Sequence, residues 1–163
     1  MAQEAALVAK RCQEAKETGI VNLSNCGLKD IPQALYFFVK NTDVTKLDIS
    51  NNQLTRVPAK ILKAFPLLVE FKCANNADIS SLPEGFSALE HLSHVDLSQN
   101  RFTKLPFVGS SMKNLDLSGN MIQTVTQEEI ENVFNLESIK LNNNPLENQS
   151  KYLLQKYANF ILH

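Results

Sequence analysis

The sequence contains few of the residue patterns that build metal centres or phosphate-binding loops. Its three histidines, His91, His94 and His163, and its three scattered cysteines have no metal-ligand spacing, and its five glycines stand singly. The 16 basic and 17 acidic residues leave a net charge of −1, which gives no general attraction to nucleic acid or to an anionic membrane. We therefore expect no metal, no cofactor, no nucleic acid and no membrane among its ligands.

Long hydrophobic segments are also missing. The longest run of large apolar residues, from Leu35 to Val39, is far too short to span a bilayer. Charged residues interrupt the region in which a signal peptide needs an apolar stretch, namely Glu4, Lys10, Arg11 and Glu14. With 44% apolar and 20% charged residues, the 163 residues are typical of one globular domain that is not exported.

An internal repeat accounts for most of the chain. Six segments share one frame of apolar positions, of which Val44–Leu47–Ile49–Asn52–Leu54 is representative. Near its end each frame has an asparagine or cysteine, which recurs after 26, 24, 24, 20 and 24 residues. These positions are Cys26, Asn52, Asn76, Asn100, Asn120 and Asn144. The frame resembles the leucine-rich-repeat superfamily, whose pattern L-x-x-L-x-L-x-x-N/C-x-L has a period of roughly 20–29 residues.

The resemblance implies an α/β fold, a right-handed leucine-rich-repeat solenoid with a curved parallel sheet on its concave side. Its convex side is expected to be mostly irregular or short helical, with helical caps at both ends because open solenoids need them. We expect a single domain over residues 1–163, with an N-terminal cap over 1–17, six repeats over 18–146 and a C-terminal cap over 147–163. The run from 82 to 102 is similar to a small vertebrate member of the intracellular type.

Each part of the frame has a physical reason. Apolar pairs at a spacing of two, such as Leu47 and Ile49, place one face of a strand in the core. The asparagine that follows offers two donors and an acceptor to backbone groups of its own and the adjacent turn. We therefore interpret the recurring Asn and Cys positions as a structural ladder, in which the Cys26 thiol is a weaker substitute. Steps such as Val57–Pro58 direct the chain onto the convex side, where no strand needs the missing N–H.

Three departures from the frame predict local differences. Ile79 comes one residue late, which predicts a bulge around Ala77–Asp78. The shortest spacing, with Gly109–Ser110–Ser111, predicts a tight convex turn instead of a helix. In the fifth repeat the stretch from Gln127 to Ile130, followed by Val133 and Phe134, predicts a short convex helix.

Both caps are expected to be amphipathic. The N-terminal helix should end at Gly19. Its apolar face is expected to contain Ala5, Val8, Cys12 and Ala15. The face over the last coil is expected to contain Tyr152, Leu153, Tyr157, Phe160 and Ile161.

The candidate binding surface is the concave face, onto which the residues between the apolar strand positions should point. Its candidate residues are Lys46, Asp48, Glu70, Lys72, His94, Asp96, Asn114, Asp116 and Lys140. The aspartates belong to the sequence Leu-Asp-Leu-Ser, which is common in such strands. The lysines, Glu70 and His94 depart from it and are therefore the stronger candidates.

Equivalent residues of successive strands should form a row across this face, and the charges in one such row suggest how a partner binds. Asp48, Lys72 and Asp96 alternate in sign and are expected to neutralise one another. Asp96 and Asp116 are adjacent like charges, and no cation lies between them in this row. We expect both carboxylates to be solvated and dispensable for folding, and to attract a Lys or Arg of a partner.

His94, Asp96 and Ser98 superficially resemble a catalytic triad. Side chains at i and i+2 on a flat strand project in parallel about 7 Å apart, so they do not converge as a triad must. No Gly-rich elbow or oxyanion donor is present nearby. We therefore predict that the protein is not an enzyme.

The leading hypothesis is a non-catalytic, intracellular adaptor that binds an unknown protein on the concave face. One alternative is a regulatory subunit that modulates an enzyme such as a phosphatase or GTPase, and another is a secreted or bacterial binding protein. We expect a monomer, with weak dimerisation possible through Tyr36, Phe37 and Phe38 as the alternative to their packing under the N-terminal helix.

The cysteines favour the cytoplasm or the nucleus. Their number is odd and none are closely paired, whereas secreted members of the superfamily usually have disulfide-rich caps. The sequons at Asn22 and Asn148 matter only in a secreted chain.

Overall fold

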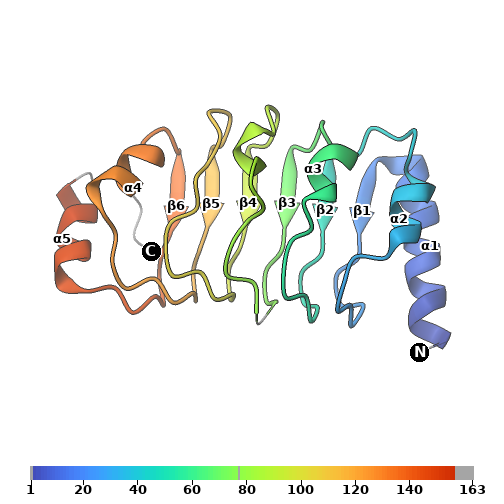
Figure 1. Ribbon diagram of the computed structural model, residues 1–163, viewed down its shortest axis with the longest axis horizontal. Coiled ribbons are helices and arrows are strands. Elements are labelled where there is room, and N and C mark those ends of the chain that lie inside the picture. The colour runs from blue at the N-terminus through green and yellow to red at the C-terminus, as the bar shows by residue number, and fades with distance from the viewer. Residues whose placement is uncertain (1, 77, 157–163) are drawn as a thin grey trace.

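The computed structural model describes residues 2–76 and 78–156, with side chains from residue 5 onward (Figure 1). Six short strands pair in chain order and all in parallel, so that each coil adds one strand to a single sheet. The strands are β1 (Ile20–Asn22), β2 (Lys46–Asp48), β3 (Glu70–Lys72), β4 (His94–Asp96), β5 (Asn114–Asp116) and β6 (Ser138–Lys140). The predicted parallel solenoid is confirmed, and no helix in the described part of the chain is long and apolar enough to cross a membrane.

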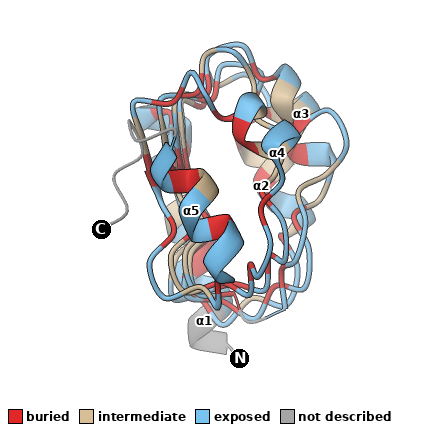
Figure 2. Ribbon diagram, turned by 90° about the vertical axis from the view of Figure 1, so that its left-hand side faces the viewer, coloured by how far each residue is buried: buried red, intermediate tan, exposed pale blue. Residues whose placement is uncertain are grey.

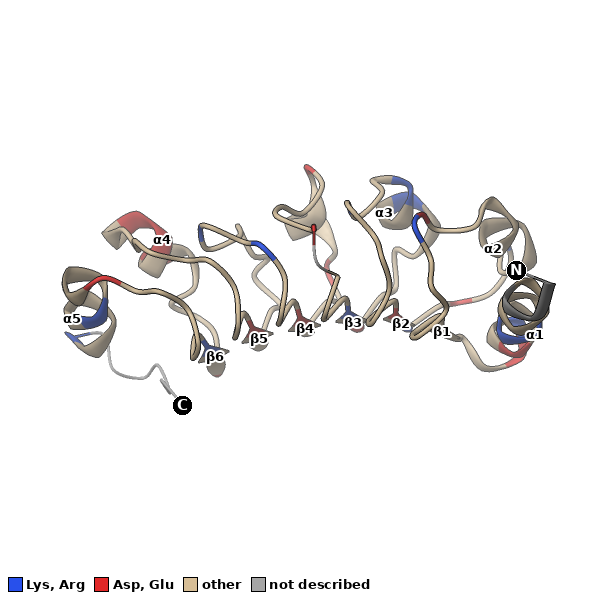
Figure 3. Cartoon of the chain, turned by 90° about the horizontal axis from the view of Figure 1, so that it is seen from below, with Lys and Arg blue, Asp and Glu red and all other residues tan. Residues whose placement is uncertain are grey.

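The middle residue of every strand points into the core. These six residues lie in register across the sheet and are all buried: Val21, Leu47, Phe71, Val95, Leu115 and Ile139. Because side chains alternate along a strand, the first and third residues of each strand face the opposite way, onto the open side of the sheet. Figure 3 shows that the row of strands bends, with this open face on the inside of the bend.

Short helices cover the convex side, as predicted. They are α2 (Gln33–Phe38), α3 (Lys60–Ala64), the 3-10 turn η1 (Phe86–Ala88) and α4 (Gln127–Asn132). The core lies between them and the sheet (Figure 2). The predicted helix of the fifth repeat is confirmed by a capping box, in which Glu129 N donates to Thr126 Oγ1 (3.2 Å) and Thr126 N donates to Glu129 Oε2 (2.8 Å). The coil before it has no helix between residues 105 and 111, as its short spacing predicts.

The recurring asparagines join consecutive coils. Asn100 Nδ2 donates to the carbonyl oxygens of Leu97 (2.9 Å) in its own coil and Cys73 (2.8 Å) in the preceding one. Its Oδ1 accepts from Asn76 N (3.2 Å). Asn52, Asn76, Asn120 and Asn144 make the same kind of contacts with carbonyl groups of their own and the preceding coil. A buried side chain with both donors and an acceptor thus satisfies backbone groups that the stack removes from water.

The extra residue before Ile79 changes the path of the chain only locally. Ala77 lies outside the described residues, so the predicted bulge is not described at that position. Ile79 itself is buried, and its carbonyl oxygen accepts from Arg101 N (2.8 Å), as that of Leu28 accepts from Gln53 N (2.8 Å). The chain has therefore rejoined the common frame at Ile79.

The helix α1 (Ala2–Thr18) covers the open end beside β1. Val8, Cys12 and Ala15 are buried, but Ala5 is exposed, so the predicted apolar face is one turn too long. The side chain of Ala5 lines a hollow beside Cys26 and Leu28 instead of packing into the core. The helix ends at Gly19, whose φ of 68° and close approach to Asp43 O leave no space for a Cβ atom.

An arginine from α1 completes the first turn of the ladder. Cys26 has no amide donor, and Arg11 Nη1 instead donates to the carbonyl oxygen of Ser24 and to Cys26 Sγ (3.2 Å). In the second coil the corresponding carbonyl oxygen, that of Ser50, accepts from Asn52 Nδ2 (3.2 Å). The cap thus supplies the donor that the cysteine lacks.

The helix α5 (Asn148–Lys156) lies over the last coil. Leu154 is buried, and the buried Ser150 hydroxyl oxygen accepts from Val125 N (2.9 Å). The expectation that Tyr152 packs on the core is wrong, because it lies two residues from either buried position and is 68% exposed. Leu153 is partly buried against the core, whereas Tyr157, Phe160 and Ile161 lie outside the described residues.

Candidate functional site

The nine predicted binding residues are the first or third residues of β2 to β6, so all lie on the open face of the sheet. One row runs Lys46, Glu70, His94 and Asn114, and the other runs Asp48, Lys72, Asp96, Asp116 and Lys140. Neighbours within a row are opposite one another on adjacent parallel strands, which brings their side chains within contact distance. The sheet therefore assembles these residues into one polar surface.

A carboxylate between two lysines dominates the N-terminal part of this surface. Glu70 Oε2 lies 2.9 Å from Lys46 Nζ, and Glu70 Oε1 lies 2.9 Å from Lys72 Nζ. Hydrogen bonds from Lys46 and then Lys72 lower the pKa of Glu70 to about 2, against its partial burial. The same contact raises the pKa of Lys72. Lys72 forms its ion pair with Glu70 on the same strand face, and Asp48 and Asp96 act on it only as weaker, more distant charges, so the expected neutralisation within the row is a secondary effect.

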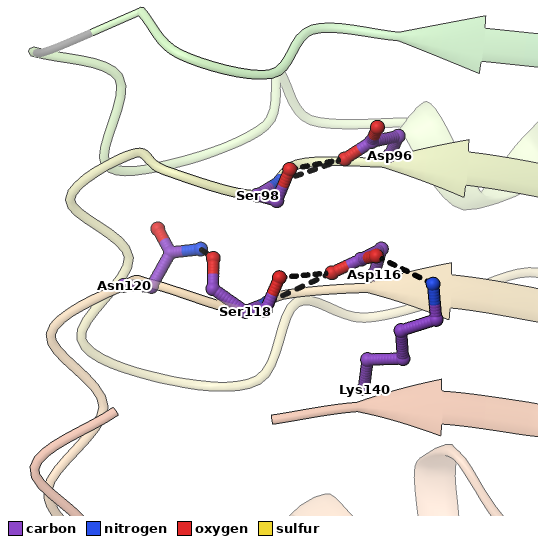
Figure 4. Close-up of polar contacts among 6 residues, drawn as sticks. All are labelled: Asp96, Ser98, Asp116, Ser118, Asn120 and Lys140. Atoms are coloured by element: carbon purple, nitrogen blue, oxygen red, sulfur yellow. Dashed lines mark hydrogen bonds and ion pairs between the residues drawn. The ribbon is translucent and has the colours of Figure 1, made fainter. Parts of the chain in front are cut away.

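Asp116 is held by three contacts. Its Oδ1 accepts from Ser118 N (3.0 Å) and Ser118 Oγ (2.6 Å), and its Oδ2 lies 3.1 Å from Lys140 Nζ (Figure 4). Burial raises the pKa of Asp116, but the Ser118 hydrogen bonds and Lys140 outweigh it, so the pKa lies below its usual value. Asp116 is therefore not the solvated, unpaired carboxylate that the sequence suggests.

Asp96 accepts hydrogen bonds but has no ion-pair partner among the described residues. Its Oδ1 accepts from Ser98 N (3.0 Å) and Ser98 Oγ (2.7 Å), which closes the turn after β4. Asp48 accepts from Ser50 N (2.9 Å) in the same way. The aspartates thus close the turns at the strand ends, and the carboxylates of Asp96 and Asp116 are half-buried and hydrogen-bonded instead of freely solvated. Replacing Asp96 by lysine would remove this acceptor, whereas Asp96→Asn would retain it.

The middle of the surface is hollowed. A depression of about 260 Å³ extends across β3 to β6. Its charged and polar lining includes Lys72, His94, Asp96, Asn114 and Lys140. Asp96 lies in this depression between Lys72 and Asp116 in its row. Lys72 is paired with Glu70 in the other row, and Asp116 is paired with Lys140. The arrangement suits a polar protein surface that carries both signs of charge.

The triad-like residues do not assemble. The Ser98 hydroxyl donates to Asp96 (Figure 4). His94 Nδ1 instead lies 2.7 Å from Ser93 Oγ. His94 and Ser98 therefore share no hydrogen bond, and the serine has no base beside it. Within the described ranges, no group of three or more His, Cys, Asp or Glu residues could hold a metal ion.

The aromatic segment on α2 is divided between surface and interior. Phe37 is 79% exposed and meets Phe38 edge to face, with ring centroids 6.4 Å apart. Tyr36 stacks on Phe65 at 6.0 Å, and Lys60 Nζ lies 4.2 Å from the centre of the Tyr36 ring. Burial and then Asp30 raise the pKa of Tyr36 to about 12. Of the three predicted contact residues, only Phe37 is a free surface aromatic.

Two features of the surface were missed from the sequence. The serines Ser98 and Ser118 fix the aspartate carboxylates, and the signal was the spacing Asp-x-Ser in each repeat. Phe107 is exposed on the convex side of the shortest coil, where the sequence predicts only a tight turn. The short spacing itself was the signal, because it removes the helix that would cover this position.

The stacked coils, the in-register parallel sheet and the asparagine turns define a leucine-rich-repeat solenoid. A family model described as leucine rich repeat matches residues 42–102. The chain is similar to leucine-rich repeat and calponin homology domain-containing protein 1 of Mus musculus, with 30% identity over 71% of this chain and 16% of that protein. It is also similar to plant intracellular Ras-group-related LRR protein 8 of Oryza sativa subsp. japonica, with 32% identity over 64% of this chain and 28% of that protein.

A solved LRR protein of Leptospira interrogans has the same fold, with a TM-score of 0.64 and 25% identity over 80% of this chain and 33% of that chain. The present chain thus spans less than a third of the length of the two relatives named above. The family match, the relatives and the fold together support assignment to the leucine-rich-repeat superfamily.

Proposed function

We propose that this protein is a non-catalytic interaction module that binds a partner protein on the concave face of its sheet. The observation that carries the proposal is the polar depression across β3 to β6, in which charges of both signs are held in fixed positions. The Glu70 carboxylate restrains Lys72, and Asp116 restrains Lys140. Restrained side chains lose less conformational entropy on binding than free ones, which favours recognition of a complementary surface.

Asp96 is the proposed contact for a basic residue of the partner. Its Oδ1 is occupied by the two Ser98 hydrogen bonds, whereas no hydrogen bond to its Oδ2 is found within the described part of the chain. A lysine or arginine of the partner would form a charge-assisted hydrogen bond there. His94 and Asn114, in the neighbouring row, offer polar contacts beside it.

A photo-crosslinking experiment tests the proposed face. A photoreactive amino acid replaces Asn114 in the depression or, as a matched control, Lys63 on the exposed convex surface of α3. We expect the Asn114 probe to capture a partner that the Lys63 probe does not capture, and Asp96→Asn to reduce that capture. Equal capture by the Asn114 and Lys63 probes would mean that the partner does not bind specifically at the concave face.

We further propose an intracellular setting, in the cytoplasm or the nucleus. All three cysteines are free and buried, which suits a reducing compartment. The resemblance of the helix-first layout and of residues 82–102 to the small vertebrate leucine-rich repeat-containing protein 20 agrees with this proposal. A monomer is the proposed state, with Phe37 as the contact for any weak dimer.

A further inference from the structure

The shortest coil leaves an open cleft on the convex side. Only 20 residues separate Asn100 from Asn120, and the coil between them has no helix where its neighbours have η1 and α4. Two hollows, of about 490 and 360 Å³, lie over this coil. They share Ser87 and Phe107 in their linings, so they lie side by side, and we name the pair the convex cleft.

The floor of the convex cleft is firmly attached to the coil before it. A Cβ atom on Gly109 would lie 2.3 Å from the carbonyl oxygen of Ser87, so the two backbones are in direct contact. The Ser111 hydroxyl donates to the carbonyl oxygen of Glu90, and Met112 N donates to Gly109 O (3.1 Å). The cleft is therefore preformed, which reduces the ordering cost of binding.

An exposed aromatic side chain lies where the two hollows meet. Phe107 is 65% exposed, although Phe86 and Leu105 beside it in the lining are buried. Hydroxyl and amide groups also line the second hollow, namely Ser87, Ser110, Asn132 and Asn135. An apolar contact flanked by donors and acceptors suits a peptide, whose side chain covers the ring while its backbone bonds the polar groups.

The charged residues that line the cleft are two glutamates and one lysine. Glu84 lines the first hollow and Glu131 the second, whereas Lys104 is the lining cation. Glu131 accepts a hydrogen bond from Gln127 but has no ion pair with any described residue. The helix α4, which forms one wall, contains three glutamates and no basic residue. This charge complements a basic ligand.

We propose that the convex cleft binds an extended, basic segment of a partner protein, with an apolar side chain of that segment against Phe107. Two hollows side by side with Phe107 between them favour an extended segment, and the glutamate in each hollow favours flanking lysines or arginines. This surface lies on the opposite side of the solenoid from the concave face. The cleft does not share residues with the concave face, so the two surfaces accommodate two partners at once.

A random peptide library displayed on phage, selected against the full chain, tests the proposal. We expect the enriched peptides to combine lysine or arginine with an aromatic or aliphatic residue. Fluorescence anisotropy should show affinity reduced about tenfold or more by Phe107→Ala and by Glu84→Lys/Glu131→Lys. Phe134→Ala is the matched control, because Phe134 is 64% exposed and does not line the cleft, and it should not change the affinity.

Several outcomes would overturn the proposal. They are a failure to enrich any peptide, enrichment of acidic peptides, and peptides that keep full affinity for Phe107→Ala. Peptides whose affinity is reduced by Asp96→Asn but not by Phe107→Ala would assign binding to the concave face instead. Self-association of the wild type that Phe107→Ala abolishes would assign the cleft to a second copy of the chain. Unchanged thermal unfolding of each variant confirms that the loss is local.

Discussion

Asn100 shows at the scale of one residue how adjacent coils are held together. Its amide contacts Leu97, Cys73 and Asn76 in two coils. Asn100→Ala should lower the free energy of unfolding by about 1–3 kcal/mol, because these buried backbone groups would lose their partner. Chemical denaturation measures the change, with Asn114→Ala on the open face as a control that should remain near wild type. A denaturation midpoint equal to wild type would mean that the ladder has no energetic role.

Tyr36 presents the opposite case, a polar group that the fold does not satisfy. Its hydroxyl is buried and has no hydrogen-bond partner among the described residues, although its ring stacks on Phe65. Tyr36→Phe retains the stacking and removes the unpaired group, so it should leave stability unchanged or raise it by about 1 kcal/mol. Thermal unfolding tests this prediction, and a clear loss of stability would reveal a contact of the hydroxyl that the structure does not contain.

The sequence predicted where the important residues lie better than it predicted which residues they contact. The asparagine frame located Asn100 and its equivalents, because a repeating turn needs one amide at a fixed place in each coil. The partner of Lys72 could not be found in this way, because Asp48, Asp96 and Glu70 were all within reach along or across strands. Side-chain length and rotamer decided in favour of Glu70, and neither is visible in a repeat pattern.

At the scale of the element, β2 and β3 are linked through Glu70. Its pKa is lowered to about 2 from the usual 4.5, so its contribution to stability is complete above pH 4.5 and is lost as the pH falls toward 2. Glu70→Gln should lower stability at pH 7 by about 1 kcal/mol or less, since the lysines are half exposed. The difference between variant and wild type should shrink as the pH is lowered from 4.5 to 2, as followed by urea denaturation. A difference that is constant over this range would contradict the ion-pair account.

The helix α1 covers the first coil. Deletion of residues 1–17 should expose the apolar groups against which Val8, Cys12 and Ala15 pack, and lower the free energy of unfolding by about 3 kcal/mol or more. Light scattering and thermal unfolding should show an aggregation-prone, less stable chain. Val8→Asp should reproduce part of the loss, whereas Leu7→Asp, on the more exposed side of the same helix, should not. A truncated chain that stays monomeric with an unchanged melting temperature would identify α1 as a binding arm instead of a cap.

The strands of the repeats were predictable from the sequence, whereas the helical caps at the two ends of the solenoid were less predictable. The six strands follow from apolar spacing alone, because each must bury the same face. Ala5 was misassigned because an apolar residue near the end of a cap has no neighbouring coil that obliges it to be buried. Tyr152 was misassigned because it lies on the face of α5 opposite the buried Ser150 and Leu154. The convex cleft was also missed, since a sequence indicates that a helix is absent without indicating the space that its absence leaves.

At the scale of the whole molecule, the solenoid separates two surfaces. The concave face presents charges in fixed pairs around Asp96, and the convex side presents a cleft around Phe107. Each surface is assembled from several coils that are adjacent in the sequence, so its shape depends on the register of the stack. The fold class followed from the sequence, whereas the charge pairing that shapes the concave face needed coordinates.

The central claim is that the concave face binds a protein, and the association rate of the crosslinked partner tests it most directly. Surface plasmon resonance at several salt concentrations would compare wild type with Asp96→Asn, which retains the oxygen that accepts from Ser98 and replaces the charged Oδ2 acceptor by a neutral amide donor. We predict slower association and a weaker dependence on salt for Asp96→Asn, and unchanged behaviour for the convex variant Lys63→Gln. Association of Asp96→Asn at the wild-type rate and with the wild-type salt dependence would contradict the claim.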